Sequence, residues 1–227
     1  MFVIPADDFQ RTEIMMVNNK KHMVISEKYN MAFTAGGLFV RESVEIANLY
    51  IKSGDWKTVK AQAHSSNLIQ ARTASSSERI CREICFRLEG LHEDELAVLI
   101  DGSLQEQQQI LWVAICRRHR FIYEFAVEVI REKYLQLNFD LLQEDYDAFF
   151  NAKAEWHDEL EKLAESTRIK LRTVVFRMLR EAEILTKTHI INPVMLTHQV
   201  ARTIGAHSPD DLRVFPLPDR DIRELLQ

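Results

Sequence analysis

The segment S-T-R-I-K-L-R-T-V-V-F-R-M-L-R (166–180) carries five bases and no acid. The segment before it, 140–165, has nine acids against two lysines, so the charge of the chain reverses near residue 165. Apolar residues of the basic segment recur with a helical period; they are Leu171, Val174, Val175, Met178, Leu179 and Ala182. This pattern predicts a basic amphipathic helix over about 167–183, preceded by one or two acidic helices.

The face of this helix opposite the apolar stripe is polar and cationic, and it carries Lys170, Thr173, Arg177 and Arg180. A cationic helix face can lie against the phosphates of nucleic acid. The alternative is a solvated face that Glu161 and Glu165 partly neutralise, with Arg168 and Arg172 at its flank.

Two other basic groups could extend a nucleic-acid surface. The first, Arg117, Arg118 and Arg120, also suits the negative end of a helix dipole. The second surrounds the turn T-A-S-S-S (73–77), where hydroxyls and a helix start could hold phosphate; it consists of Arg72, Arg79 and Arg82. Its alternative is a capping box from Ser75 to Glu78 with solvated arginines.

Composition limits the choice of function. The 227 residues carry a net charge of −5 with a pI near 5.9, so any nucleic-acid binding must come from a local patch. No phosphate-binding loop, nucleophile elbow or zinc-protease motif is present, so we predict no catalytic residue and no cofactor. His157 and Glu161 lack a third ligand, and three cysteines without CxxC spacing indicate buried thiols; neither predicts a metal site.

No segment reaches the roughly 20 apolar residues that cross a bilayer. The longest clean run is Ile110–Cys116, and residues 1–17 lack the apolar core of a secretion signal. We therefore expect a cytoplasmic protein without a membrane partner.

The sequence predicts an all-α fold with short connections, since only six glycines and five prolines occur. The expected helices before residue 140 are 38–52, 56–64, 76–88, 92–101, 103–119 and 121–137. After the basic helix we expect a helix from Asn192-Pro193 to Ile204, ended by Gly205. Leu212–Leu217 and Ile190-Ile191 are strand candidates for a wing.

These elements suggest three parts: a leader over 1–28, a helical bundle over 29–139, and a helix-turn-helix or winged-helix-like part over 140–227.

Three stretches carry a resemblance to a known family. They are Y-N-M-A-F-T-A-G-G-L-F-V-R-E-S-V-E-I-A-N-L-Y (29–50), D-W-K-T-V (55–59) and N-L-I-Q-A-R-T-A-S-S-S-E-R-I-C-R-E-I-C-F-R-L (67–88). Together they resemble BrxA, component A of the bacteriophage-exclusion (BREX) defence systems. The resemblance implies a bundle similar to the RNA-binding antitermination factor NusB, a role in phage resistance, and DNA binding; it brings no catalytic residue.

We thus predict a non-enzymatic, weakly sequence-selective binder of double-stranded DNA that accompanies other BREX components. The oligomeric state is left open, with a monomer favoured. The first alternative is a protein adaptor that uses an acidic face, namely Asp145, Glu155, Asp158, Glu159 and Glu161. RNA binding, by analogy with NusB, is the second alternative.

Overall fold

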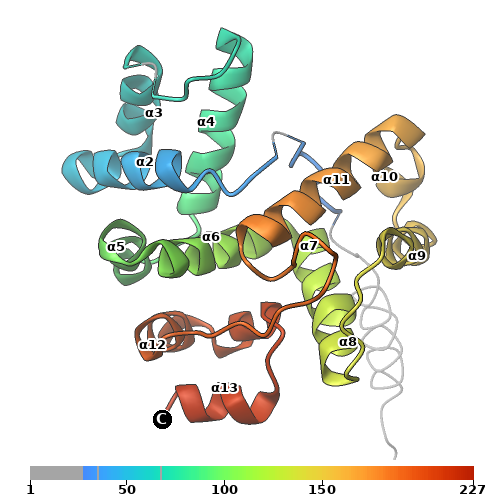
Figure 1. Ribbon diagram of the computed structural model, residues 1–227. Coiled ribbons are helices and arrows are strands. Elements are labelled where there is room, and N and C mark those ends of the chain that lie inside the picture. Colours follow the sequence, from blue (N-terminus) through green and yellow to red (C-terminus); the bar gives the residue numbers. More distant parts are fainter. Residues whose placement is uncertain (1–27, 35, 67) are drawn as a thin grey trace, which may run out of the picture.

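A computed structural model describes residues 28–34, 36–66 and 68–227, and Figure 1 shows it as a ribbon. The predicted leader lies outside these residues except for Lys28. Up to residue 118 the helices of the described part of the chain are α2 (Val40–Ser53), α3 (Trp56–Ser65), α4 (Ala74–Leu88), α5 (Glu93–Asp101) and α6 (Leu104–Arg118). All five confirm predicted helices, with small shifts at their ends.

A longer helical rod follows, in which a π-helical turn joins two α-helical pieces; its parts are α7 (Arg120–Phe125), η1 (Ala126–Arg131) and α8 (Glu132–Leu135). The rest of the chain forms α9 (Gln143–Ala154), α10 (Asp158–Glu161), α11 (Glu165–Glu181), α12 (His198–His207), the 3₁₀ helix η2 (Pro209–Val214) and α13 (Asp219–Leu225). The acidic segment therefore forms two helices, and the basic helix is α11. The described residues hold no named strand, which confirms the all-α class.

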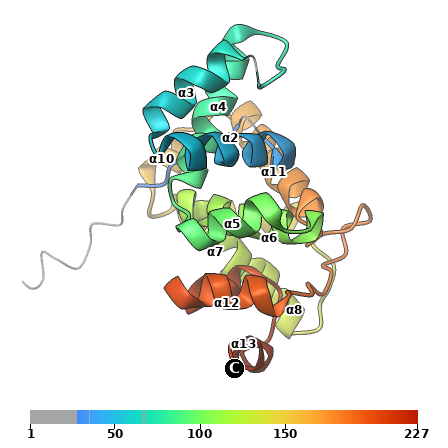
Figure 2. The ribbon, with the colours of Figure 1, turned by 90° about the vertical axis from the view of Figure 1, so that its left-hand side faces the viewer.

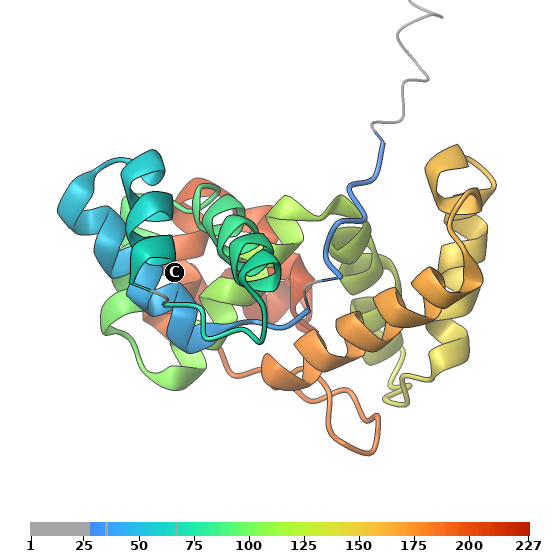
Figure 3. The same ribbon diagram turned by 90° about the horizontal axis from the view of Figure 1, so that it is seen from above.

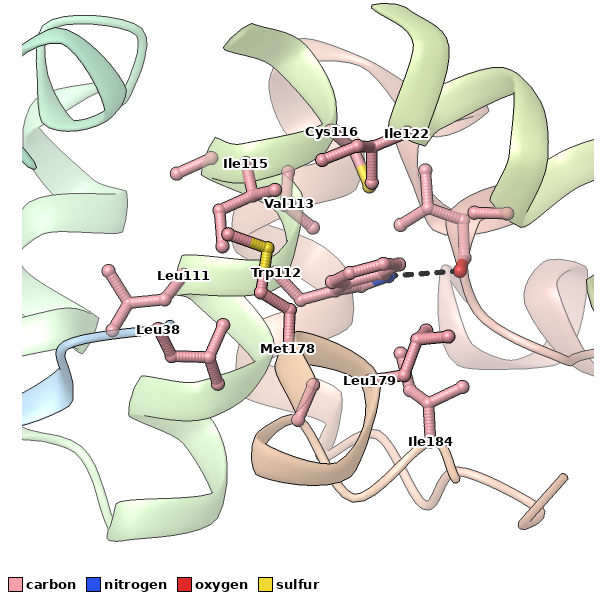
Figure 4. Packing of buried hydrophobic residues seen from close by; sticks show 14 of the residues in the cluster. Leu38, Leu111, Trp112, Val113, Ile115, Cys116, Ile122, Met178, Leu179 and Ile184 are labelled. Carbon is pink, nitrogen blue, oxygen red and sulfur yellow. Dashed lines mark hydrogen bonds between the residues drawn. The ribbon is translucent and has the colours of Figure 1, made fainter. Parts of the chain in front are cut away.

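Helix α6 forms the centre of the fold. Every residue from Ile110 to Cys116 is buried, and a helix that is apolar all round must be covered on all sides. Figure 2 shows α2–α4 above the α5–α6 layer and α12–α13 below it. The indole Nε1 of Trp112 donates to the carbonyl oxygen of Val214 at 3.1 Å, so this fully buried ring satisfies its one donor (Figure 4).

The carboxyl-terminal half of α11 packs onto α6. Figure 4 shows Met178 and Leu179 of α11, with Ile184 just beyond its end, near the ring of Trp112. Seen from above, α11 runs along one edge of the molecule from the central helices to α10 (Figure 3). Its position is thus set by the core at one end and by the acidic helices at the other.

Aromatic packing attaches the acidic helix α9 to the rod. Phe121 lies edge-on to Tyr146 and Phe149 with ring centroids 5.8 and 5.1 Å apart, and Phe125 lies 5.3 Å from each of the same two rings. Such edge-to-face pairs add to the free energy of area burial. The apolar side of the acidic segment is therefore core, and most of its acids are exposed.

Four predictions for the last 40 residues are wrong. Residues 192–197 are not helical, and α12 begins only after Thr197, whose hydroxyl accepts from the amide of Val200 at 3.2 Å. Gly205 does not end the helix, because α12 continues to His207; an added Cβ at Gly205 would stand 2.3 Å from Cδ2 of Leu226, so the glycine makes room for that side chain.

The strand predicted at Leu212–Leu217 is also absent, because Pro209–Val214 is a 3₁₀ helix packed on α6 and η1. Ile190 and Ile191 make only isolated bridges, to Asp140 and Leu185, so these segments form no wing among the described residues.

The proposed division near residue 140 stays a prediction. Buried residues on both sides of it belong to one apolar cluster, and α12 and η2 pack on α5 and α6.

Candidate nucleic-acid interface

Helix α11 presents two distinct faces. Its buried side comprises Leu171, Val174, Val175, Phe176, Met178 and Leu179. This set contains all the apolar residues predicted within the helix, and Ala182, just after its end, is also buried. The apolar period therefore fixes which side of α11 meets solvent.

The solvent side carries the predicted cations. Lys170, Thr173 and Arg177 are exposed, and Arg180 is half-buried at the edge. Lys170 and Arg177 are two turns apart, about 10 Å at 1.5 Å per residue. Neither Lys170 nor Arg180 forms an ion pair with the described residues. The Thr173 hydroxyl donates to the carbonyl of Ile169 at 2.9 Å, so it offers a ligand only its acceptor capacity. We call Lys170, Thr173, Arg177 and Arg180 the α11 stripe.

Arg177 also has a structural contact. Its guanidinium donates to the carbonyl oxygen of Gly36, and its Nε lies 3.9 Å from a carboxylate oxygen of Glu181. Glu181 in turn accepts from the backbone amide of Leu38 at 2.6 Å. Arg177 and Glu181 therefore fasten the 36–38 loop to α11, while half of the Arg177 side chain (52%) stays exposed.

The acidic helices do not cover the stripe. Arg172 pairs with Asp147 of α9, and Arg168 donates to the carbonyls of Leu163 and Glu161 at 3.1 and 3.0 Å. These two arginines thus tie the inner flank of α11 to the acidic helices. No ion pair joins Glu161 or Glu165 to the stripe among the described residues, so the predicted neutralisation by these acids does not occur there.

A cleft of about 1010 Å³ opens at the carboxyl-terminal end of the stripe. Arg177, Arg180 and Lys187 line one part of it, and the non-helical segment 192–197 lines another. Two acids, Glu181 and Glu183, also reach it, which leaves three cations against two carboxylates. Lys187 is exposed and forms no ion pair with the described part of the chain.

In the second predicted group, Arg117 is held inside the protein. Arg117 makes two bonds of 2.7 Å to the buried carboxylate of Glu95 and a third of 2.7 Å to Asp211. Burial lowers the pKa of Arg117, but its hydrogen bonds to Glu95 and Asp211 raise that pKa by more, so it stays charged. Its guanidinium is thus used inside the protein, and we correct its assignment from DNA contact to an internal ion pair.

The neighbours of Arg117 are also engaged. The guanidinium of Arg118 lies 4.7 Å from the centroid of the Phe86 ring, and Arg120 donates to Glu124 at 2.6 Å. Arg120 remains half exposed, with 49% of its side chain accessible. This group offers less free cationic surface than its sequence indicated.

The third predicted group is exposed but separate. Arg72, Arg79 and Arg82 surround the start of α4, and none forms an ion pair with the described residues. The cap of this helix is Thr73, whose hydroxyl accepts from the amide of Ser76 at 3.2 Å, so the predicted Ser75 cap is wrong. Figures 1 and 2 place the start of α4 at the outer end of the α2–α4 group, away from α11.

Other chemistry finds no support in the described residues. They hold no cluster of three or more potential metal ligands. His157 is buried and bonds Glu159 at 3.0 Å, while its ring packs on Tyr29. None of the described helices has the length and apolar character needed to cross a membrane.

Sequence reasoning missed the cleft. Lys187 follows α11 in a loop. The sequence predicts a helix from Asn192-Pro193 onward, and this helix would include Met195. Gln105 and Gln109 of α6 approach the cleft through tertiary packing. No local pattern connects these residues, although the two glutamines at i and i+4 do share a helix face.

Comparison with known proteins supports the resemblance in residues 29–88 and extends it along the chain. The BrxA family profile matches residues 27–208. The chain belongs to the BrxA family. Among its relatives is the BREX protein BrxA of Escherichia coli O9:H4 (strain HS), 28% identical over 147 residues, which cover 65% of this chain and 69% of the relative.

A second BrxA family relative is the BREX protein BrxA of Bacillus cereus (strain H3081.97). It is 26% identical over 160 residues, covering 70% of this chain and 80% of the relative. The fold is similar to a crystal structure of an uncharacterized protein from Magnetospirillum magneticum, with a TM-score of 0.70 and 21% identity over 82% of this chain and 97% of that one. This likeness shows a shared fold.

Proposed function

We propose that this BrxA family member is a non-enzymatic, double-stranded DNA-binding component of a BREX phage-defence system. The observation that carries the proposal is the α11 stripe. Lys170 and Arg177 are exposed two helical turns apart, Arg180 lies half-buried at the edge, and the acidic helices that precede α11 form no ion pair with these cations among the described residues. Relatives named as BREX proteins supply the biological setting.

The stripe supports phosphate contact with little base selectivity. Lysine and arginine neutralise phosphates and release counterions, which gives salt-sensitive binding that carries little sequence information. The local arrangement is also compatible with a net charge of −5, because no acid of α9 or α10 forms an ion pair with the stripe among the described residues.

The test is a charge reversal that spares the fold. Lys170→Glu/Arg180→Glu removes two free cations and leaves the Arg177 contact with Gly36 intact. We expect binding to a duplex of about 30 base pairs to fall at least tenfold at low salt, with a salt slope lower by about 2. Mobility shift or fluorescence anisotropy at several salt concentrations measures both quantities.

The matched control is Arg220→Glu/Arg223→Glu, which makes the same charge change at two exposed arginines of α13. At physiological salt the control should bind DNA within about twofold of the wild type, because screening there limits the reach of distant charges to roughly 8 Å. Equal loss in both variants, or no loss in either, would remove the stripe from the proposal. An RNA duplex and single-stranded RNA as competitors separate DNA from RNA binding.

A specific observation also favours the adaptor alternative. Trp156 lies between α9 and α10 with 80% of the residue exposed, and the acids Glu155 and Asp158 flank it. Exposed tryptophan is enriched in the energetic centres of protein interfaces. Of the predicted acidic face, Asp145 pairs with Lys133 and Glu159 is held internally. Under this alternative, Trp156→Ala abolishes pull-down of another BREX component and leaves DNA binding unchanged.

A further inference from the structure

Met195 is an exposed apolar side chain on a fixed backbone. It is 78% exposed, whereas its neighbours Val194 and Leu196 are 8% and 9% exposed. Burial of both neighbours directs the Met195 side chain outward. Met195 lines the same cleft as Arg177 and Arg180, at the end of the α11 stripe, which connects it to the proposed DNA surface.

The backbone of Met195 is held from below by α6. Its carbonyl oxygen accepts from the side-chain amide of Gln105 at 3.1 Å and from that of Gln109 at 3.0 Å. Gln109 itself is only 2% exposed, so one of these two donors belongs to the core. Two donors occupy both lone pairs of the carbonyl. The backbone of Met195 is therefore held in a fixed position at the cleft.

From this arrangement we propose that Met195 inserts between adjacent base pairs of the bound duplex and kinks it. The inference rests on the proposed DNA binding and adds a deformation to it. Proteins that bend DNA insert methionine, leucine or proline side chains between base steps while neighbouring cations hold the backbone. Arg177, Arg180 and Lys187 line the same cleft as Met195, against the two acids Glu181 and Glu183. These three cations would contact the phosphates on both sides of the kink.

The test measures DNA shape separately from affinity. A duplex of about 25 base pairs is stiff, because it is much shorter than the persistence length of about 150 base pairs. Donor and acceptor dyes at its ends therefore report bending by energy transfer, and anisotropy on the same duplex reports binding. A central TA step offers a flexible site for insertion.

We expect the wild type to bring the duplex ends closer, by a bend in the range of about 20–90°. Met195→Ala should bind within about tenfold of the wild type with an unchanged salt slope, since the phosphate contacts remain, and should lose the bend. Met195→Leu, which keeps an apolar side chain of similar volume, should retain it. Ile51→Ala, at a 56% exposed position on α2, is the matched control and should bend DNA like the wild type.

Each outcome decides one question. A wild-type complex with unbent DNA, or equal bending by Met195→Ala, overturns the insertion and leaves the proposed DNA binding standing. Absence of duplex binding by the wild type at low salt overturns the proposed function itself, and the insertion with it. Bending that needs an apolar residue at 195 supports the inference.

Discussion

Gly36 illustrates how a single residue positions the stripe. Its φ of 62° lies in the left-handed region, and an added Cβ would stand 2.6 Å from Nη2 of Arg177 and 2.8 Å from Cγ2 of Val174. The glycine therefore allows the 36–38 loop to lie directly against α11.

Gly36→Ala should lower the free energy of unfolding by about 2–4 kcal/mol. About 1–2 kcal/mol comes from the left-handed backbone, and the remainder from displacing Arg177 and Val174. Gly54 is the control, because its φ is 65° and nothing lies within 4 Å of its added Cβ. Gly54→Ala should therefore lose only about 1–2 kcal/mol. Urea denaturation compares the two, and equal losses would show that the contact with α11 contributes nothing.

Glu83 holds a buried charge network between α4 and α6. Its carboxylate accepts from Nε of Arg87 at 2.9 Å and lies 2.6 Å from Nε2 of His119. The other ring nitrogen of His119 faces the carbonyl of Asn30 at 3.2 Å, so both nitrogens meet acceptors. Burial raises the pKa of Glu83, but its bonds with His119 and the charge of Arg87 outweigh burial, and the net pKa is lowered.

A lowered carboxyl pKa stabilises the fold above the unfolded-state pKa, about 4.3 for glutamate. This contribution is lost as the pH falls through the still lower folded-state pKa. Glu83→Gln should therefore lower the free energy of unfolding by about 3–5 kcal/mol near pH 7, because it leaves the charge of Arg87 buried and unpaired. The difference in free energy of unfolding between this variant and the wild type should narrow below about pH 4. Glu78→Gln, at an exposed position on the same helix, should change the free energy of unfolding by no more than about 0.5 kcal/mol from the wild type. Urea titrations at several pH values measure this, and a pH-independent gap would argue against an ionised Glu83.

The start of α4 shows how tertiary packing chooses between two possible N-cap residues. The letters T-A-S-S-S-E suit a cap at either Thr73 or Ser75, and tertiary packing selects Thr73: Ser77 is buried and donates to the carbonyl of Ile69 at 2.9 Å. Thr73→Ala should cost about 0.5–2 kcal/mol through loss of the cap.

Ser75→Ala should instead be neutral or slightly stabilising, since position 75 is inside the helix and alanine is the better helix former. Thermal unfolding followed by circular dichroism compares the two variants. A larger loss of stability in Ser75→Ala than in Thr73→Ala would show that Ser75 caps the helix, as the sequence predicts.

The difference between local sequence signals and contacts distant in sequence explains which elements could be predicted. Helices with a local signal, such as Asp55 capping α3 or the apolar stripe of α11, follow from the sequence alone. Residues 192–197 do not, because two α6 glutamines hold the backbone at Met195 and local propensity favours a helix after Pro193. Arg117 was misassigned for the same reason: its partners Glu95 and Asp211 are distant in sequence.

At the scale of the whole molecule, contacts across residue 140 predict joint unfolding. Trp112 bonds Val214, Arg117 bonds Asp211, and Arg131 donates to the carbonyl of Leu217 at 3.0 Å. These contacts link the central helix and the rod to the last 20 residues. Removing residues 140–227 would expose the fully buried Trp112 and leave the Glu95–Arg117 pair without Asp211.

We therefore expect one cooperative transition rather than one for each side of residue 140. Trp56→Phe/Trp156→Phe leaves Trp112 as the single tryptophan. Its indole lies at the contact between α6 and η2. Its fluorescence and the far-ultraviolet circular dichroism should change at the same urea concentration. Adding Arg117→Met should shift both transitions together, by about 3–5 kcal/mol, because the carboxylate of Glu95 is left buried without its partner. Two separated transitions, with only the fluorescence responding to Arg117→Met, would show that 29–139 and 140–227 are independent folding units.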